Sequence, residues 1–149
     1  VGSAMASSSA RPSNPMPAPD PFPGYLVVPS IKLSTMVREN VDLVNLDPVH
    51  IPETRSPNQP GHVSIFGHRT SHGREFRNLD RLKPGALIYL STGGRTYTYS
   101  VTNTRILSPD DPALWATTSN DQTLSLSACH PPGSTKFRIT VYAKLVAVS

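Results

Sequence analysis

Sixteen prolines are spread over the 149 residues of this chain, and they argue against a fold built from long helices. A proline inside a helix removes a backbone hydrogen bond and clashes with the preceding turn. Between the prolines, short runs alternate polar and apolar side chains with the period of a β-strand, and no stretch keeps the period of a helix. With nine glycines and five tyrosines, this pattern predicts an all-β barrel or sandwich.

The chain is long enough for one hydrophobic core, and we expect a single folded domain over residues 24–149. Residues 1–23 consist mainly of Ser, Ala and Pro, so burial cannot offset the entropy of ordering them. We expect this segment to be a linker. Within it, residues 1–6 resemble a remnant of an expression vector.

Charge and composition narrow the classes of function. The formal net charge is +4, but the arginines are interleaved with acidic residues, which indicates a solvated surface rather than a nucleic-acid site. No run of about 20 apolar residues is present, so the sequence predicts no membrane span. Cys129 is the single cysteine, so it cannot form an internal disulfide and its thiol stays free.

Alternation and turn residues together predict where the strands lie. We expect a hairpin around residues 92–94 and one helical turn over residues 76–82 whose apolar side chains face inward. The expected strands are residues 25–29, 31–37, 61–67, 86–91, 95–103, 105–108, 123–127 and 137–146, with an irregular loop over residues 109–122.

Cys129 stands where a strand-like run meets a turn. Residues 123–127 alternate as a half-buried strand does, and Pro131-Pro132-Gly133 must then end that strand. Arg138 lies at the start of the following strand. If the two strands pair through the turn, Arg138 returns beside Cys129, where it is placed to hold the oxyanion that thiol attack creates.

A thiol nucleophile also needs a group that manages protons, and His68 is the best placed histidine. It ends the strand predicted over residues 61–67. His62 lies at the opposite end of that strand, and His130 adjoins Cys129, where alternation points neighbouring side chains to opposite faces. For Arg69, which alternates away from His68, we expect an exposed position. The histidines to compare are His50, His62, His68, His72 and His130.

Several short stretches match one known family as a set. They are Gly67-His68-Arg69, Phe76, Leu79-Asp80, Leu82-Lys83-Pro84-Gly85, Tyr97-Thr98-Tyr99-Ser100-Val101, Cys129-His130-Pro131 and Arg138. With this set the sequence resembles the sortases, the cysteine transpeptidases of Gram-positive cell surfaces, and most of all the actinobacterial housekeeping type called class E. The resemblance covers residues 25–148, and it departs at Ala128, where the family usually has Thr.

The resemblance implies a closed eight-stranded β-barrel with short helical turns, including a short helix over residues 41–46. It implies that Cys129 attacks the Thr carbonyl of a sorting signal of the type Leu-Pro-x-Thr-Gly or Leu-Ala-x-Thr-Gly, cleaving between Thr and Gly. His68 exchanges protons with the leaving and incoming amines, and Arg138 holds the substrate backbone and the oxyanion. The residues expected to contact the substrate are Ala128, His130, Leu114 and Trp115.

The same resemblance names partners and a location. The substrates are surface proteins with a C-terminal sorting signal, and the acceptor is a peptidoglycan amine, or a pilin lysine if the enzyme assembles pili. No cofactor and no metal is expected. We expect action at the extracellular face of the cell membrane, with an N-terminal anchor helix that is missing from this chain.

Other interpretations stay open. An L,D-transpeptidase also uses Cys and His on peptidoglycan, but it typically has Gly where this chain has Ala128. A non-catalytic surface-binding β-barrel is the alternative from outside the enzymes. Asp20-Pro21-Phe22 resembles the Asp-Pro-aromatic lid of pilus-assembling sortases, although a proline-rich linker is the preferred interpretation.

The residue types allow two metal sites, and both are incomplete. Zinc held by Cys129, His68 and His130 lacks a fourth ligand. Calcium near Asp110, Asp111 and Asp121 lacks the six to eight clustered oxygens that such a cation prefers.

Overall fold

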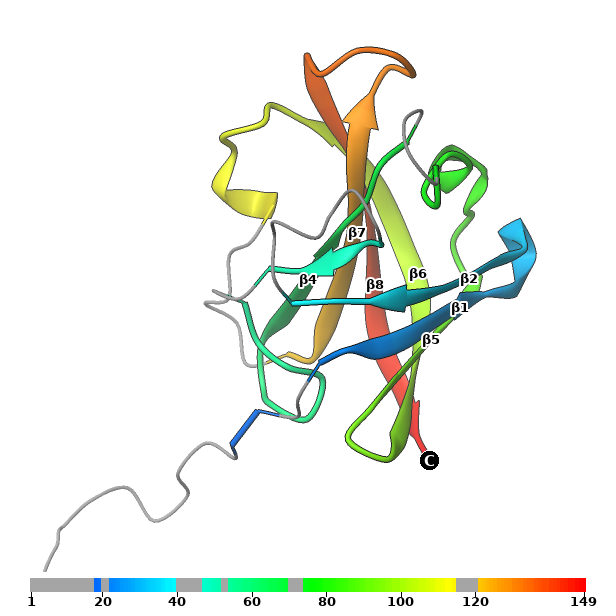
Figure 1. Cartoon of the computed structure of the whole chain (residues 1–149), viewed down its shortest axis with the longest axis vertical. Coiled ribbons are helices and arrows are strands. Elements are labelled where there is room, and N and C mark those ends of the chain that lie inside the picture. The colour runs from blue at the N-terminus through cyan, green and yellow to red at the C-terminus, as the bar shows by residue number, and fades with distance from the viewer. Residues whose placement is uncertain (1–17, 20–21, 40–46, 52–53, 70–73, 115–120) are drawn as a thin grey trace, which may run out of the picture.

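The computed structural model of the chain describes residues 18–19, 22–39, 47–51, 54–69, 74–114 and 121–149. Its strands form one eight-stranded sheet in the order β2-β1-β5-β6-β8-β7-β4-β3, which curls around a common core (Figure 1). The strands are β1 (Gly24–Val28), β2 (Leu33–Val37), β3 (Val49–His50), β4 (His62–Phe66), β5 (Leu87–Thr92), β6 (Arg95–Leu107), β7 (Thr123–His130) and β8 (Phe137–Val148). The short 3₁₀ helices in the described connections are η1 (Pro29–Ile31), η3 (Leu79–Arg81) and η4 (Pro112–Leu114).

The two edge strands of the sheet meet through Arg38, which follows β2. Arg38 forms a parallel bridge with Val49 of β3. The Arg38 N–H donates to the Pro48 carbonyl at 2.9 Å, and the Arg38 carbonyl accepts from the His50 N–H at 2.6 Å. This contact joins the edges of the sheet, and a joined sheet offers fewer unpaired backbone groups to other chains. The expected all-β, eight-stranded barrel is confirmed.

The core lies inside the barrel because alternate side chains of each strand point inward. Leu26, Ile65, Leu90 and Leu126 are fully buried members of it, from four different strands. The helical turn expected over residues 76–82 is present as η3 and its flanks, and its apolar side chains close one end of the core. These are Phe76, Leu79 and Leu82.

The prediction that a new strand begins at residues 105–108 was wrong, because β6 is one strand of 13 residues. Its ladder with β8 is interrupted by register shifts at Thr98/Tyr99 and Val101/Asn103. An extra residue at such a shift bends the strand without ending its pairing, so the chain follows the curve of the barrel. The helix expected over residues 41–46 lies outside the described residues.

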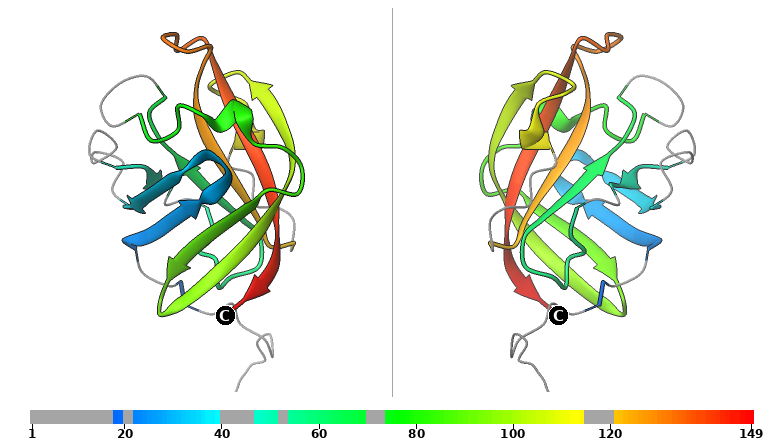
Figure 2. Two further views of the ribbon diagram at one scale, coloured as in Figure 1. Left: turned by 90° about the vertical axis from the view of Figure 1, so that its right-hand side faces the viewer. Right: turned by 90° about the vertical axis from the view of Figure 1, so that its left-hand side faces the viewer.

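One strand pair is parallel, and it positions the site. β4 pairs with β7 in the register His62 to Thr123, Ser64 to Ser125 and Phe66 to Ser127. All the other strand pairs in the described ladders are antiparallel. Because β4 and β7 run in the same direction, both end at the same rim of the barrel, next to the β7–β8 turn seen at the top of Figures 1 and 2.

No helix in the described part of the chain is long and apolar enough to cross a membrane.

Replacing Phe76 by Ala should destabilise the fold by about 3–5 kcal/mol, because it removes a fully buried ring and leaves a cavity. The free energy of unfolding, measured by urea titration, checks this expectation. Phe137→Ala is the matched control, since Phe137 is exposed and its loss should cost less than about 1 kcal/mol. Equal losses for the two variants would contradict the role given to Phe76.

Candidate active site

Cys129 and Arg138 lie opposite each other in the antiparallel ladder of β7 and β8. The turn between the two strands reverses the chain over residues 131–136. Side chains of directly opposed residues have Cβ atoms about 4.5–5.5 Å apart, so the long guanidinium side chain has the thiol within its reach. Cys129 is partly exposed and carries a free thiol.

The Arg138 guanidinium is oriented by its neighbours. Its Nη1 donates to the carbonyls of Thr135 at 3.0 Å and Phe137 at 3.1 Å. Its central carbon lies 5.6 Å from the centre of the Phe66 ring, within the range of a cation–π contact. A guanidinium has five N–H donors, so donors remain for a bound carbonyl or oxyanion beside Cys129.

His68 reaches the same rim from β4. Phe66 is paired with Ser127, and the next residue, Gly67, donates its N–H to the Ser127 carbonyl at 3.0 Å. The paired register ends there, and counting the same register two residues further predicts that His68 lies beside Cys129. The three residues expected to carry the chemistry therefore come from three adjacent segments, with Cys129 in the middle. His68 is partly exposed, and its carbonyl accepts from the Phe76 N–H at 3.1 Å.

A glycine precedes His68 for a steric reason. A Cβ atom added at Gly67 would lie 2.9 Å from a carbon of the Phe76 ring, which is closer than real Cβ contacts come. Phe76 is fully buried, so its ring has little room to move away. The chain can therefore approach the Phe76 ring at Gly67 only without a side chain, immediately before His68.

Alternation along β7 divides its side chains between two faces. Leu124, Leu126 and Ala128 belong to the core. Ser127 and Cys129 consequently point to the outer face. Ala128 was expected to contact the substrate, but its side chain is fully buried in the core, so only its main chain is available for such a contact.

A cavity of about 210 Å³ lies on the outer face next to Arg138. Leu114 of η4 is one of its walls, at a position where a substrate contact was expected, whereas Trp115 lies outside the described residues. The Leu114 carbonyl accepts from the Ser64 hydroxyl at 2.9 Å, which holds η4 over β4. The lining residues are Ile51, Ser64, Phe66, Pro109, Leu114, Ser127 and Arg138.

Arg69 was expected to be exposed, and that expectation was wrong, because only 4% of its surface is accessible. Its Nη1 donates to Nδ1 of His130 at 2.6 Å, and its Nη2 lies 3.4 Å from the Asp80 carboxylate. Arg69 therefore lies at the closed rim of the barrel, between His130 and Asp80, rather than in solvent. His130, expected to bind substrate, uses one ring nitrogen in this contact.

His62 is held at the far end of the outer face. Its two ring nitrogens lie 2.8 Å from the hydroxyls of Thr123 and Ser125. Thr123 precedes Cys129 by six residues, or about 20 Å of strand, so His62 is remote from the thiol. Burial lowers the pKa of His62 to about 4.

The remaining histidines are placed as follows. His50 is 2% exposed, and its Nε2 lies 2.8 Å from the Arg55 carbonyl. The Phe22 ring stacks on His50, with ring centres 4.4 Å apart, and packs against the core. Phe22 thus occupies the interior side of the barrel rather than the face that carries Cys129. The other two residues of the motif resembling a lid, and His72, lie outside the described residues.

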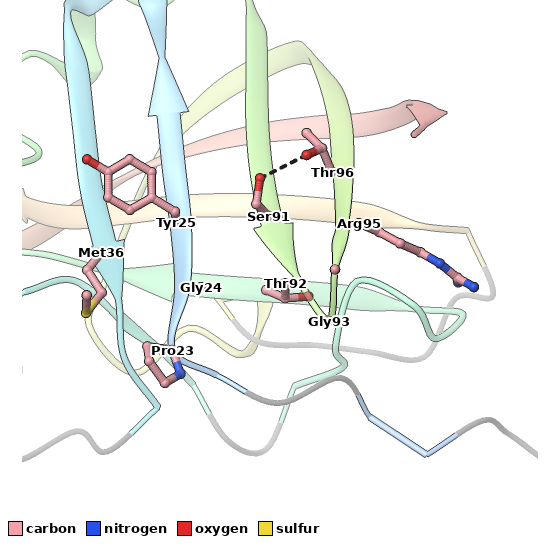
Figure 3. Close-up of a pocket in the computed structure, with 10 residues that line it drawn as sticks. Pro23, Gly24, Tyr25, Met36, Ser91, Thr92, Gly93, Arg95 and Thr96 are labelled. Carbon is pink, nitrogen blue, oxygen red and sulfur yellow. Dashed lines mark hydrogen bonds between the residues drawn. The ribbon is translucent and has the colours of Figure 1, made fainter.

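Two further observations concern ligands. Within the part of the chain that the structure describes, no three His, Cys, Asp or Glu side chains gather as a metal site would require. A cavity of about 400 Å³ lies near the start of β1 and the β5–β6 turn, lined among others by Tyr25, Met36 and Arg95 (Figure 3). It is at the end of the barrel opposite to the β7–β8 turn, and its lining contains no histidine or cysteine.

The lowered pKa of His62 predicts a loss of stability in acid. An unfolded histidine has a pKa of about 6.5, so the unfolded chain binds this proton before the native chain does. The stability contributed by neutral His62 is present above pH 6.5 and is lost as the pH falls toward 4.

Between pH 7.5 and pH 5 this group should therefore cost the protein about 2 kcal/mol of unfolding free energy. Urea titrations at both pH values check the expectation against His62→Gln, which removes the titrating group and shares all the others. An identical change with pH in both proteins would contradict it.

The sequence matches known proteins over most of the described domain. A profile of the family described as "Sortase domain" matches residues 26–146. "Sortase D" of Bacillus subtilis is 26% identical over 128 residues, which are 83% of this chain and 63% of that protein. "Sortase SrtE1" of Streptomyces coelicolor is 28% identical over 95 residues, which are 58% of this chain and 27% of that protein. The chain thus spans less than two thirds of the length of these two relatives.

Solved structures resemble the fold closely. Sortase C-1 from Actinomyces oris superposes with a TM-score of 0.78 and 27% identity, covering 86% of this chain and 76% of that one. Sortase C-3 from Streptococcus pneumoniae superposes with a TM-score of 0.76 and 28% identity, covering 88% and 65% respectively.

Proposed function

Because this chain belongs to the sortase family, we propose that it is a cysteine transpeptidase that cleaves a sorting signal between Thr and Gly and transfers the acyl group to an amine. The observation that supports the proposal is that Cys129 lies opposite Arg138 and at the end of β7 next to the segment that leads from β4 to His68. A nucleophile, a proton carrier and an oxyanion donor are the three groups that acyl transfer requires.

In the first half of the reaction the thiolate of Cys129 attacks the Thr carbonyl carbon, and the electron pair of the carbonyl moves to its oxygen. Arg138 donates hydrogen bonds to that oxyanion. The intermediate collapses when the bond to Gly breaks, and His68 gives its proton to the leaving amine. The product is a thioester between Thr and Cys129, and the released peptide carries Gly at its N-terminus.

In the second half an incoming amine attacks the thioester and loses a proton to His68. Collapse of the second intermediate, again at Arg138, forms the new amide bond and releases the thiolate of Cys129. His68 thus loses a proton in the first half and regains one in the second, so it returns to its starting protonation state after one turnover. The proposed acceptor is a peptidoglycan amine, which places the enzyme at the extracellular face of the cell membrane.

The cavity of about 210 Å³ next to Arg138 supports binding of an apolar signal residue. Its walls include Ile51, Phe66 and Leu114, and it opens on the same face as Cys129. We propose that it takes the Leu of a signal of the type Leu-Pro-x-Thr-Gly or Leu-Ala-x-Thr-Gly. If the enzyme is of class E, the preferred residue at the second position of the signal is Ala.

A pilus-assembling enzyme that uses a pilin lysine as acceptor is the second candidate, favoured by the likeness to the two sortase C structures. Against it stands the placement of Phe22, which stacks on His50 instead of covering the cysteine. The two candidates share the chemistry at Cys129 and differ in the amine that they accept.

Cleavage of both signal peptides, with and without an added amine, tests the proposal by mass spectrometry. We expect cleavage between Thr and Gly and a new amide when amine is present, with a preference between Ala and Pro at the second position.

Cys129→Ala should lose all turnover and keep its melting temperature, because a partly exposed thiol at the rim adds little to the core. Retained cleavage by the Ala variant would rule out Cys129 as the nucleophile. A wild-type protein that cleaves neither peptide, and whose binding is unchanged by thiol alkylation, would instead indicate a binding module.

Arg138→Lys should lower kcat/KM about 100- to 1000-fold, although it conserves charge. The planar fork of a guanidinium can bond its own loop carbonyls and an oxyanion at once, whereas an ammonium is a point donor. Arg95→Lys is the matched control, because Arg95 is exposed at the opposite end of the barrel. Near-normal kinetics for Arg138→Lys would make Arg138 a surface charge.

A further inference from the structure

Arg69 is a buried cation whose two ends bind different segments of the chain. It directly follows His68, and its partner His130 directly follows Cys129. The hydrogen bond between Nη1 and Nδ1 of His130, at 2.6 Å, therefore links the residues adjacent to the proposed proton carrier and nucleophile. Nη2 faces Asp80 of η3, a carboxylate that is 54% exposed, at 3.4 Å.

The position of this contact matters because the ladder between the two segments ends just before it. β4 ends at Phe66, and in the described part of the chain Gly67 to Ser127 is the last backbone hydrogen bond between these segments. His68 lies beyond that bond. The His68 carbonyl is bonded to the Phe76 N–H, and the side chain of Arg69, the next residue, ties this segment to the end of β7.

The contact also lies on the correct side of the sheet. Cys129 and His130 are neighbours in β7, and neighbouring side chains in a strand point to opposite faces, so the contact of His130 with Arg69 lies on the inner side while Cys129 faces outward. A link on the inner side can fix the spacing between His68 and Cys129 without occupying the face on which the substrate would bind. A guanidinium can only donate, so Nδ1 of His130 must accept and its ring proton is carried by Nε2.

From this geometry we propose that Arg69 is a positioning residue, which clamps His130 and thereby holds His68 at the working distance from Cys129. The inference rests on the proposed transpeptidase reaction for its kinetic consequence. Arg69 touches neither substrate nor reacting atoms. Its contribution is to keep the proton carrier and the nucleophile in register after the backbone ladder has ended.

The test compares kcat per active site in four variants, with sites counted by stoichiometric alkylation of Cys129. Arg69→Met and His130→Leu should each lower kcat about 10- to 100-fold with KM changed by less than about twofold, because orientation rather than binding is lost. His130→Asn should keep most of the rate, because its side-chain oxygen can accept the Arg69 proton in place of Nδ1. Arg81→Met, an exposed charge next to Asp80, is the control and should leave kcat unchanged.

The double variant Arg69→Met/His130→Leu separates positioning from general destabilisation. If the two residues act through one contact, the double variant should be no slower than either single variant. Additive losses, a loss shared by Arg81→Met, or an unchanged kcat in Arg69→Met would each overturn the proposal.

A spectroscopic measurement does not depend on turnover. Nitrogen-15 spectra of wild-type protein should show His130 protonated at Nε2 alone, with mixed tautomers in Arg69→Met and no change in Arg81→Met. A wild-type protein without acyl transfer but with this tautomer pattern would refute the proposed function and keep the clamp. A wild-type His130 protonated at Nδ1 would refute the clamp whatever the activity.

Discussion

The parallel pairing of β4 with β7 is the interaction on which the site depends. It joins two strands that are about 60 residues apart in sequence, and it carries both to the same rim. Were they antiparallel, the ends of the two strands would lie at opposite rims, and His68 and Cys129 with them. The β7–β8 hairpin then adds Arg138 from the other side through purely local pairing. One long-range and one short-range ladder thus assemble the three side chains.

Local alternation was sufficient to predict most of the strands and the place of Arg138. Cys129, Arg138 and the turn between them lie within ten residues, so chain reversal alone brings them together. The helical turn over residues 76–82 could also be predicted from the sequence, because three apolar residues share its inner face. Family resemblance supplied the closed barrel, which alternation alone left open between barrel and sandwich.

What the sequence did not predict were features that arise only after closure. Arg69 alternates away from His68, and nothing local indicates that the opposite face is closed by His130 and Asp80. The continuity of β6 past Asn103 was missed for a related reason, since its bends are fixed by pairing with β8. Buried cations and bent strands depend on partners that are distant in sequence, so a local pattern cannot reveal them.

The long separation between β4 and β7 has a consequence for biosynthesis. During synthesis from the N-terminus, β4 (His62–Phe66) is made well before β7 (Thr123–His130). The backbone groups of β4 that pair with β7 therefore stay unpaired until β7 has been made. Closing the loop between the two strands costs chain entropy before the stabilising contacts form, and this slows folding. The rim that carries Cys129 and Arg138 is consequently completed only when the last third of the chain has been made, and until then β4 is a surface on which aggregation or a chaperone can act.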